Sequence, residues 1–246
     1  FAAERAVSAA LLTLAGIDGR QAGVIEAFLA ASSSGQAQPE KLLENWGRPW
    51  RISAPGLEFK PFPTCAGTHS AAEAAQMLRQ QWLAAGKPLD ALLSQIVDIT
   101  VAFPPGGDIA ASISVPKHGI EARFSLEYVI AAMLIYGDLR LQDFAEGDLN
   151  HQIMPLAARV RRTPDNSAPP DAINPALRFH DVTLTLSDST KLHQRRTRQQ
   201  SLAESVDVNR KLQLALKASS PDLLAASELR STADLQALGR AVLSAL

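Results

Sequence analysis

The sequence predicts a mixed fold, in which an all-helical domain formed by both ends of the chain carries an inserted α+β lid domain. Two patterns predict this arrangement. Apolar residues recur at helical spacing over 2–14 and again over 201–246. Between these stretches, 95–103 and 179–187 alternate polar and apolar residues and contain β-branched side chains, as strands do. Helices at both ends and strands in the middle favour α+β structure inserted into a helical domain.

The domain boundaries follow from the change in character after Gly47. We expect residues 1–46 and 201–246 to form the helical domain and residues 47–200 to form the α+β lid. Phe1 is not an initiator methionine, and the chain opens already in helical register. We therefore expect an upstream part of the helical domain to be missing from this chain.

Glycine and proline mark where the elements of the first half end or begin. Gly16 and Gly19 end the first helix, and Pro39 stands in the first turn of the third. The run Pro-Pro-Gly-Gly at 104–107 breaks the first long strand. The expected helices are 2–14, 21–31, 39–46 and 70–85, and the expected extended segments are 51–53 and 95–103.

The second half contains one strongly apolar helix, two strands that can pair, and a helical end. The turn at 187–190 suits a hairpin between the strands on either side of it. The expected elements are helices at 122–136 and 141–146, strands at 158–162, 179–187 and 191–198, and helices over 201–246 that restart after Pro221 and at Ser231.

Composition excludes several classes of function. The 246 residues are 46% apolar and 20% charged, with a formal net charge of -1, so nothing attracts the chain to nucleic acid or to an anionic membrane. The apolar run at 129–136 is too short to cross a bilayer. One cysteine, Cys65, excludes an internal disulfide, a cysteine-built zinc site and a protein-held iron–sulfur cluster. We expect a cytoplasmic protein that uses no metal and no cofactor.

The segment from Phe59 to His69, here called the motif loop, concentrates chemical groups. It contains Lys60, Cys65 and His69 around two prolines and a glycine, directly before a helix. A cation, an imidazole and free N–H groups at a helix start together suit a carboxylate. The alternative is a rigid turn with a surface lysine and a histidine at the helix N-terminus.

Three segments resemble a known family. The motif loop with the residues around it resembles the signature of the MmgE/PrpD family, which includes 2-methylcitrate dehydratase, cis-aconitate decarboxylase and iminodisuccinate epimerase. Two further blocks are similar to family segments and follow in the same order. The blocks are 56–74, 121–137 and 153–160. The resemblance covers nearly the whole chain and matches roughly the C-terminal half of a typical family member.

The resemblance implies site residues. Family members place a lysine and a histidine at the positions of Lys60 and His69, in a pocket for di- and tricarboxylic acids. Lys60 would hold a carboxylate by charge, and His69 would hold or move a proton. Cys65 departs from decarboxylase-like members, which carry a histidine there, and this argues against cis-aconitate decarboxylation. Arg123 suits a bidentate carboxylate clamp, and pairing with a neighbouring glutamate is the alternative.

The resemblance also implies an activity. We expect a cofactor-independent lyase, similar to 2-methylcitrate dehydratase, that removes a proton next to a carboxylate of a small di- or tricarboxylic acid and works as a homodimer. One alternative is an isomerase that resembles iminodisuccinate epimerase. The other is a truncated, non-catalytic member that needs a partner chain.

Overall fold

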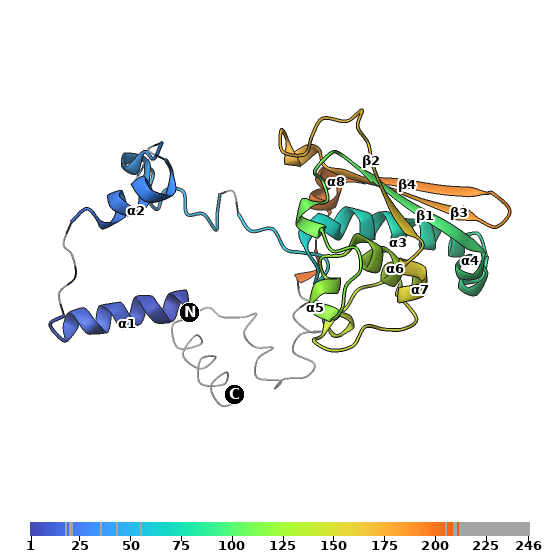
Figure 1. Cartoon of the computed structure of the whole chain (residues 1–246), viewed down its shortest axis with the longest axis horizontal. Helices are drawn as coiled ribbons and strands as arrows, with labels where there is room; N and C mark the ends of the chain where they lie inside the picture. The colour runs from blue at the N-terminus through green and yellow to red at the C-terminus, as the bar shows by residue number, and fades with distance from the viewer. Residues whose placement is uncertain are drawn as a thin grey trace. The chain divides into compact units, whose positions relative to one another are not determined.

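A computed structural model describes most of the chain before residue 205 and a few residues beyond it (Figure 1). The described residues are 1–17, 19, 22–34, 36–42, 44–54, 56–204, 206–208 and 211. The chain divides into two compact units between Leu57 and Glu58. Within the described ranges, every helix falls short of the length and apolar character that crossing a bilayer requires.

The described residues of the first unit, Phe1–Leu57, form α1 (Ala2–Leu14), α2 (Val24–Ser32) and the 3-10 turn η1 (Pro39–Leu42). The first two helices confirm the predictions at 2–14 and 21–31. The third expected helix is reduced to the 3-10 turn, and the extended segment expected at 51–53 forms turns instead. Neither α1 nor α2 contains a buried residue, so their apolar side chains build no core.

The second unit is built on one mixed sheet with the strand order β2-β1-β3-β4. Its strands are β1 (Ile96–Phe103), β2 (Val160–Pro164), β3 (Phe179–Leu186) and β4 (Lys191–Thr197). β1 pairs parallel with β2 and antiparallel with β3. β3 and β4 pair antiparallel across a tight turn, which confirms the predicted hairpin.

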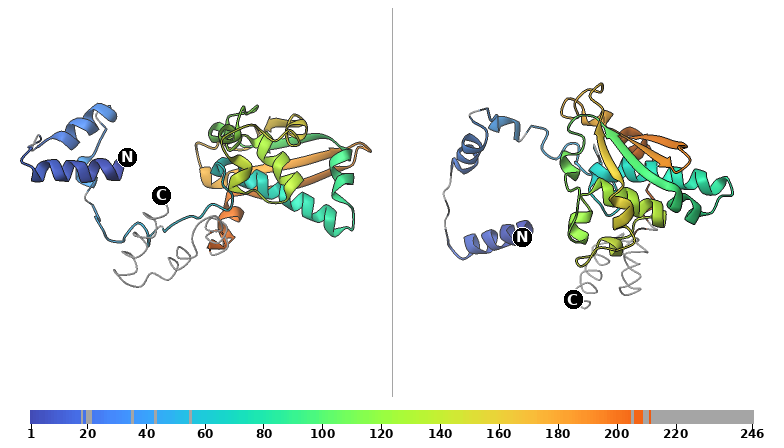
Figure 2. Two further views of the ribbon diagram at one scale, coloured as in Figure 1. Left: turned by 90° about the horizontal axis from the view of Figure 1, so that it is seen from below. Right: turned by 45° about the vertical axis from the view of Figure 1, so that its right-hand side comes forward.

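Alternation along the strands separates a buried face of the sheet from a polar one. Ile99, Val101 and Val182 are 0% exposed, whereas Thr100 and Thr183 between them are half-buried. The helices gather on the buried face, as Figures 1 and 2 show. The helices and 3-10 turns of this unit are η2 (Ala66–Thr68), α3 (His69–Ala84), α4 (Leu89–Gln95), η3 (Ile109–Ala111), α5 (Gly119–Ala122), α6 (Leu126–Tyr136), η4 (Leu141–Phe144), α7 (Met154–Ala157), η5 (Pro175–Leu177) and α8 (Arg198–Ala203).

The helices α3 and α6 form the centre of the core. α3 packs against α6, β3 and β4, and small alanines such as Ala71 and Ala75, both 0% exposed, let these elements approach closely. The expected helix at 122–136 is interrupted, because the hydroxyl of Ser125 accepts a hydrogen bond from the N–H of Tyr128 and begins α6 anew. Gly137, with φ of 76°, ends α6 in the left-handed conformation.

The predicted fold class is wrong. Among the described residues there is one four-stranded mixed sheet with helices on one face, rather than an all-helical domain that carries an α+β lid. The physical reason is burial: the buried apolar residues belong to the segment 62–186 around the sheet, and α1 and α2 contribute none. Of the helices expected over 201–246, the last residues of α8 are described, and most of that stretch lies outside the described residues. The boundaries at residues 46 and 200 stay a prediction.

Candidate functional site

The motif loop is held in shape by hydrogen bonds between its own residues and to its neighbours. The hydroxyls of Thr64 and Thr68 lie 2.9 Å apart, and the hydroxyl of Thr68 donates to the carbonyl of Cys65 at 2.8 Å. The N–H of Cys65 donates to the carbonyl of Arg123 at 2.9 Å, which ties the loop to the end of α5. Phe62 is 6% exposed and anchors the loop in the core. The loop is therefore a fixed platform for its side chains.

Lys60 and His69 meet at one backbone carbonyl. Nζ of Lys60 donates to the carbonyl oxygen of Thr64 at 3.3 Å, and Nε2 of His69 lies 3.3 Å from the same oxygen. Lys60 is exposed, whereas His69 is 7% exposed at the start of α3, edge-on to the ring of Phe62. The structure thus brings the two residues predicted for catalysis together, with the lysine on the solvent side.

His69 is neutral at physiological pH. Burial is the largest cause that lowers the pKa of His69, and the positive charges of Lys60 and Lys211 add to it. Hydrogen bonds to the backbone of Thr64 and Phe62 oppose these effects, and the resulting pKa is about 4. An unprotonated imidazole can accept a proton, and a protonated one cannot. His69 therefore has the protonation state of a base.

Lys211 joins this group, and the sequence analysis missed it. Its Nζ donates to the carbonyl oxygens of Lys60 and Pro61, the second at 3.4 Å. Burial lowers the pKa of Lys211, the nearby charge of Lys60 lowers it further, and the charge of Asp138 opposes both. No sequence signal could have found it, because Lys211 lies 151 residues after Lys60 and belongs to no motif.

Arg123 supports the motif loop through its backbone and binds a carbonyl through its side chain. Its Nε and Nη2 donate to the carbonyl oxygen of Phe144 at 3.2 and 2.8 Å. Neither neighbouring glutamate pairs with it, because Glu121 lies against His118 and Glu127 against Arg162. The structure therefore does not bring the guanidinium of Arg123 into contact with Lys60 or His69, and its predicted role as a carboxylate clamp stays a prediction.

Cys65 contributes to the local structure of the motif loop. Its Sγ donates to the carbonyl of Ala110 at 3.3 Å and accepts from the N–H of Gly67 at 3.4 Å, so the thiol caps η2. Within the described part of the chain, no three His, Cys, Asp or Glu side chains group as metal ligands would.

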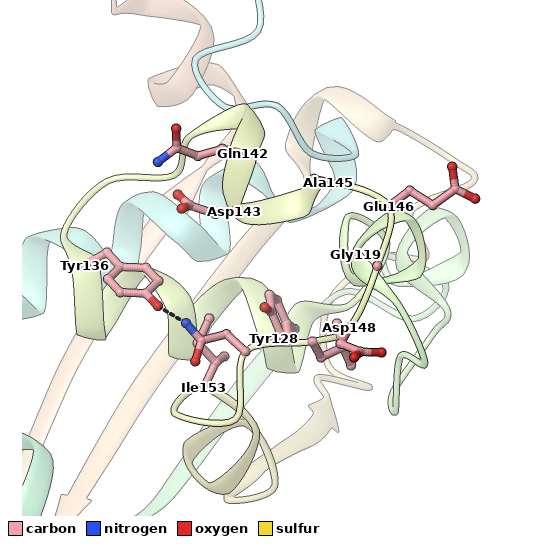
Figure 3. Close-up of a pocket in the computed structure, with 12 residues that line it drawn as sticks. Gly119, Tyr128, Tyr136, Gln142, Asp143, Ala145, Glu146, Asp148 and Ile153 are labelled. Carbon is pink, nitrogen blue, oxygen red and sulfur yellow. Dashed lines mark hydrogen bonds between the residues drawn. The ribbon is translucent and has the colours of Figure 1, made fainter.

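One cavity of the second unit lies away from the predicted site residues. It has a volume of about 530 Å³ and lies between α6 and the segment 142–153 (Figure 3). Three carboxylates, two phenols and two amides line it: Asp143, Glu146, Asp148, Tyr128, Tyr136, Gln142 and Asn150. Burial raises the pKa of Tyr128, and the amide of Asn150 donates to the hydroxyl of Tyr136. Such an acidic wall repels a polycarboxylate, so this cavity does not suit the substrate class that the resemblance implies.

The model of the MmgE/PrpD C-terminal domain matches residues 62–202. The chain belongs to the MmgE/PrpD family. The matched segment begins just after Lys60 and includes His69 and Arg123. This finding confirms the family resemblance stated from the motif loop and the two later blocks.

Two curated relatives in the MmgE/PrpD family are enzymes. Human (Homo sapiens) cis-aconitate decarboxylase is 29% identical over 193 residues, which cover 76% of this chain and 38% of the human protein. The mouse (Mus musculus) cis-aconitate decarboxylase is 26% identical over 208 residues, which cover 79% of this chain and 39% of the mouse protein. The chain thus spans about two fifths of the length of the relatives it matches.

Proposed function

We propose that this chain is the carboxylate-binding part of a lyase that acts on a small di- or tricarboxylic acid. The observation that carries the proposal is the meeting of the ammonium of Lys60 and the neutral imidazole of His69 at the carbonyl of Thr64. Membership of the MmgE/PrpD family supports it, and so do the names of both relatives, which are lyases. The epimerase alternative gains no such support.

Lys60 is the group that holds the substrate. Its ammonium is exposed and donates to the carbonyl of Thr64. A carboxylate can replace this neutral acceptor with a negatively charged one, which binds an ammonium more strongly. When the proton leaves the reacting carbon, negative charge develops on the neighbouring carboxylate, and a nearby positive charge stabilises it. Lys60 supplies that charge from a loop that is already in place.

His69 is the group that moves the proton. In dehydration, the base takes a proton from the carbon next to a carboxylate, the electron pair of that C–H bond forms a carbon–carbon double bond, and hydroxide leaves as water after it receives a proton from an acid. The low pKa of His69, about 4, keeps it in the accepting form at pH 7.

Two lyase reactions compete for this site. Dehydration of a citrate-like acid is our first candidate. The decarboxylase-like members of the family resemble one another in carrying a histidine at the position of Cys65. In this chain the thiol of Cys65 caps η2 instead. Decarboxylation of cis-aconitate is the second candidate, because it is the reaction named for both relatives.

Carbon–hydrogen exchange in deuterated water tests the proposal. We expect the chain, or the full product of its gene, to exchange or consume at least one acid among citrate, 2-methylcitrate and cis-aconitate, followed by proton NMR. Lys60→Ala and His69→Gln should each lower the rate by a hundredfold or more, in the range of a positioned acid–base group. Lys191→Ala, an exposed lysine on β4, is the matched control and should keep the rate.

The product distinguishes the two reactions, since dehydration releases water and keeps all carboxylates, whereas decarboxylation releases carbon dioxide. Unchanged turnover in both Lys60→Ala and His69→Gln would remove the catalytic assignment. Absence of exchange with every acid, by the full gene product, would remove the lyase proposal.

A second hypothesis is that the chain alone is not catalytic and needs a partner chain. The observation that favours it is the apolar surface of α1 and α2, where Leu11, Val24 and Phe28 are more than half exposed. On this hypothesis the isolated chain associates at micromolar concentration and turns over nothing until the partner is added. Sedimentation measures the association, and a monodisperse monomer that binds citrate would contradict the hypothesis. The expected homodimer stays a prediction, which the same measurement tests.

A further inference from the structure

We infer that Lys211 holds a second carboxylate of the bound acid, beside the one held by Lys60. This inference rests on the proposed function and deepens it, because it makes the site selective for acids with two or more carboxylates. Lys211 belongs to no sequence motif. Its contacts and its electrostatic surroundings support the inference.

The contacts place the ammonium of Lys211 on the motif loop. It donates to the carbonyl oxygens of Lys60 and Pro61, while Lys60 donates to the carbonyl of Thr64 four residues along the same loop. Both ammonium groups therefore lie on one short stretch of backbone, 60–64. An ammonium has three N–H donors, and the two carbonyl bonds of Lys211 leave one for a ligand.

The charges around Lys211 favour an anion. Lys60 and Lys211 both act on His69 as positive charges, and Lys60 acts on Lys211 in the same way. The opposing group is the carboxylate of Asp138, which raises the pKa of Lys211 against these effects. Two ammonium groups on one loop repel each other, and a dianion between them removes that repulsion.

The two lysines predict a specificity. A monocarboxylate can use Lys60 alone, since Lys60 is the exposed group. A di- or tricarboxylate can use both, with one carboxylate on each ammonium. Loss of Lys211 should therefore weaken the binding of citrate and cis-aconitate and leave the binding of a monocarboxylate such as propionate unchanged.

Calorimetric titration of the 246-residue chain with citrate, cis-aconitate and propionate tests the inference. We expect Lys211→Gln to weaken citrate and cis-aconitate about ten- to a hundredfold, as for loss of a charge-assisted hydrogen bond, and to leave propionate within twofold. Lys211→Arg, which keeps the charge, should recover most of the affinity. Lys60→Ala should weaken all three acids, and Lys191→Ala should weaken none.

The outcomes separate the two proposals. If the unaltered chain binds none of the acids, the result contradicts both the proposed function and the inference about Lys211. If Lys60→Ala weakens binding and Lys211→Gln does not, the inference about Lys211 alone is overturned. It is also overturned if Lys211→Gln weakens propionate as much as citrate and lowers the unfolding temperature, because Lys211 would then only fasten the motif loop.

Discussion

At the scale of single residues, the histidines show how strongly burial decides chemistry. His180 on β3 is 0% exposed; its Nδ1 lies 2.8 Å from the hydroxyl of Ser70, and its Nε2 has no hydrogen-bond partner among the described residues. Burial, assisted by the positive charge of Arg178, lowers the pKa of His180 to about 3. His69 resembles it in burial, but its ring lies beside two lysines at the motif loop. Buried imidazoles thus occur in this chain both with and without a candidate function.

Both histidines predict acid sensitivity. An unfolded histidine has a pKa near 6.5, so below that pH the unfolded chain binds protons that folded His69 and His180 do not bind until about pH 4 and 3. The unfolding free energy should therefore fall as pH drops from 6.5 toward 4, by up to about 1.4 kcal/mol per pH unit for each histidine. Urea unfolding between pH 7 and pH 4.5 measures this slope.

His180→Asn isolates the contribution of His180, because asparagine can still bond to Ser70 but does not titrate. In His180→Asn, the slope of the unfolding free energy against pH should correspond to about one bound proton fewer than in the unaltered chain. His151→Asn, at an exposed turn, is the control and should keep the original slope. An unchanged slope in His180→Asn would contradict the prediction.

At the scale of elements, β2 is held to the core by a buried ion-pair network. Nε and Nη2 of Arg162 bind both oxygens of Glu127 at 2.7 and 2.8 Å, and Nη1 binds Asp108 at 2.9 Å. Glu127 lies on α6 and is 6% exposed. The network therefore joins the parallel edge of the sheet to α6.

Removal of Arg162 should be costly. Arg162→Ala leaves the carboxylate of Glu127 buried without its partner, and we expect a loss of about 3–5 kcal/mol in unfolding free energy. The adjacent Arg161, 67% exposed and paired with Asp98, is the matched control, and Arg161→Ala should cost no more than about 1 kcal/mol. Equal losses in the two variants, measured by urea unfolding, would refute this account of β2.

The elements also show what the sequence could predict. The hairpin of β3 and β4 was predictable, because alternation through Val182 and Leu184 and a short turn are local signals. The parallel pairing of β1 with β2 was not, because it joins Ile99 to Val160 across a long crossover. In the site, Lys60 and His69 were predictable from the motif loop. The position of Lys211 and the hydrogen bond from Arg123 to the carbonyl of Phe144 were not predictable, because they depend on contacts between segments that are distant in the sequence.

At the scale of the whole molecule, the fold class failed because helical spacing says nothing about what a helix packs against. α1 and α2 form as predicted and yet bury none of their residues, whereas the core forms around the sheet between 62 and 186. Apolar periodicity was therefore a good guide to each element and a poor guide to the domain that contains it.

Removal of the first unit tests this division. A chain that begins at Glu58 should keep the unfolding free energy of the second unit within about 0.5 kcal/mol, because the second unit contains its own buried core between residues 62 and 186. Thermal and urea unfolding, followed by the fluorescence of Trp82, which is 8% exposed in the second unit, measure it. A loss of several kcal/mol would show that the first unit stabilises the second.

The 151 residues between Lys60 and Lys211 also set the order in which the site can form. The whole sheet lies between these residues in the sequence, so closing their contact is a late event that waits for β4 and the segment after it. During synthesis, a chain that has emerged only as far as Thr197 already contains the four described strands, β1 to β4, and the complete motif loop, but it lacks Lys211. Affinity for a polycarboxylate should therefore appear late in folding, after the sheet has formed.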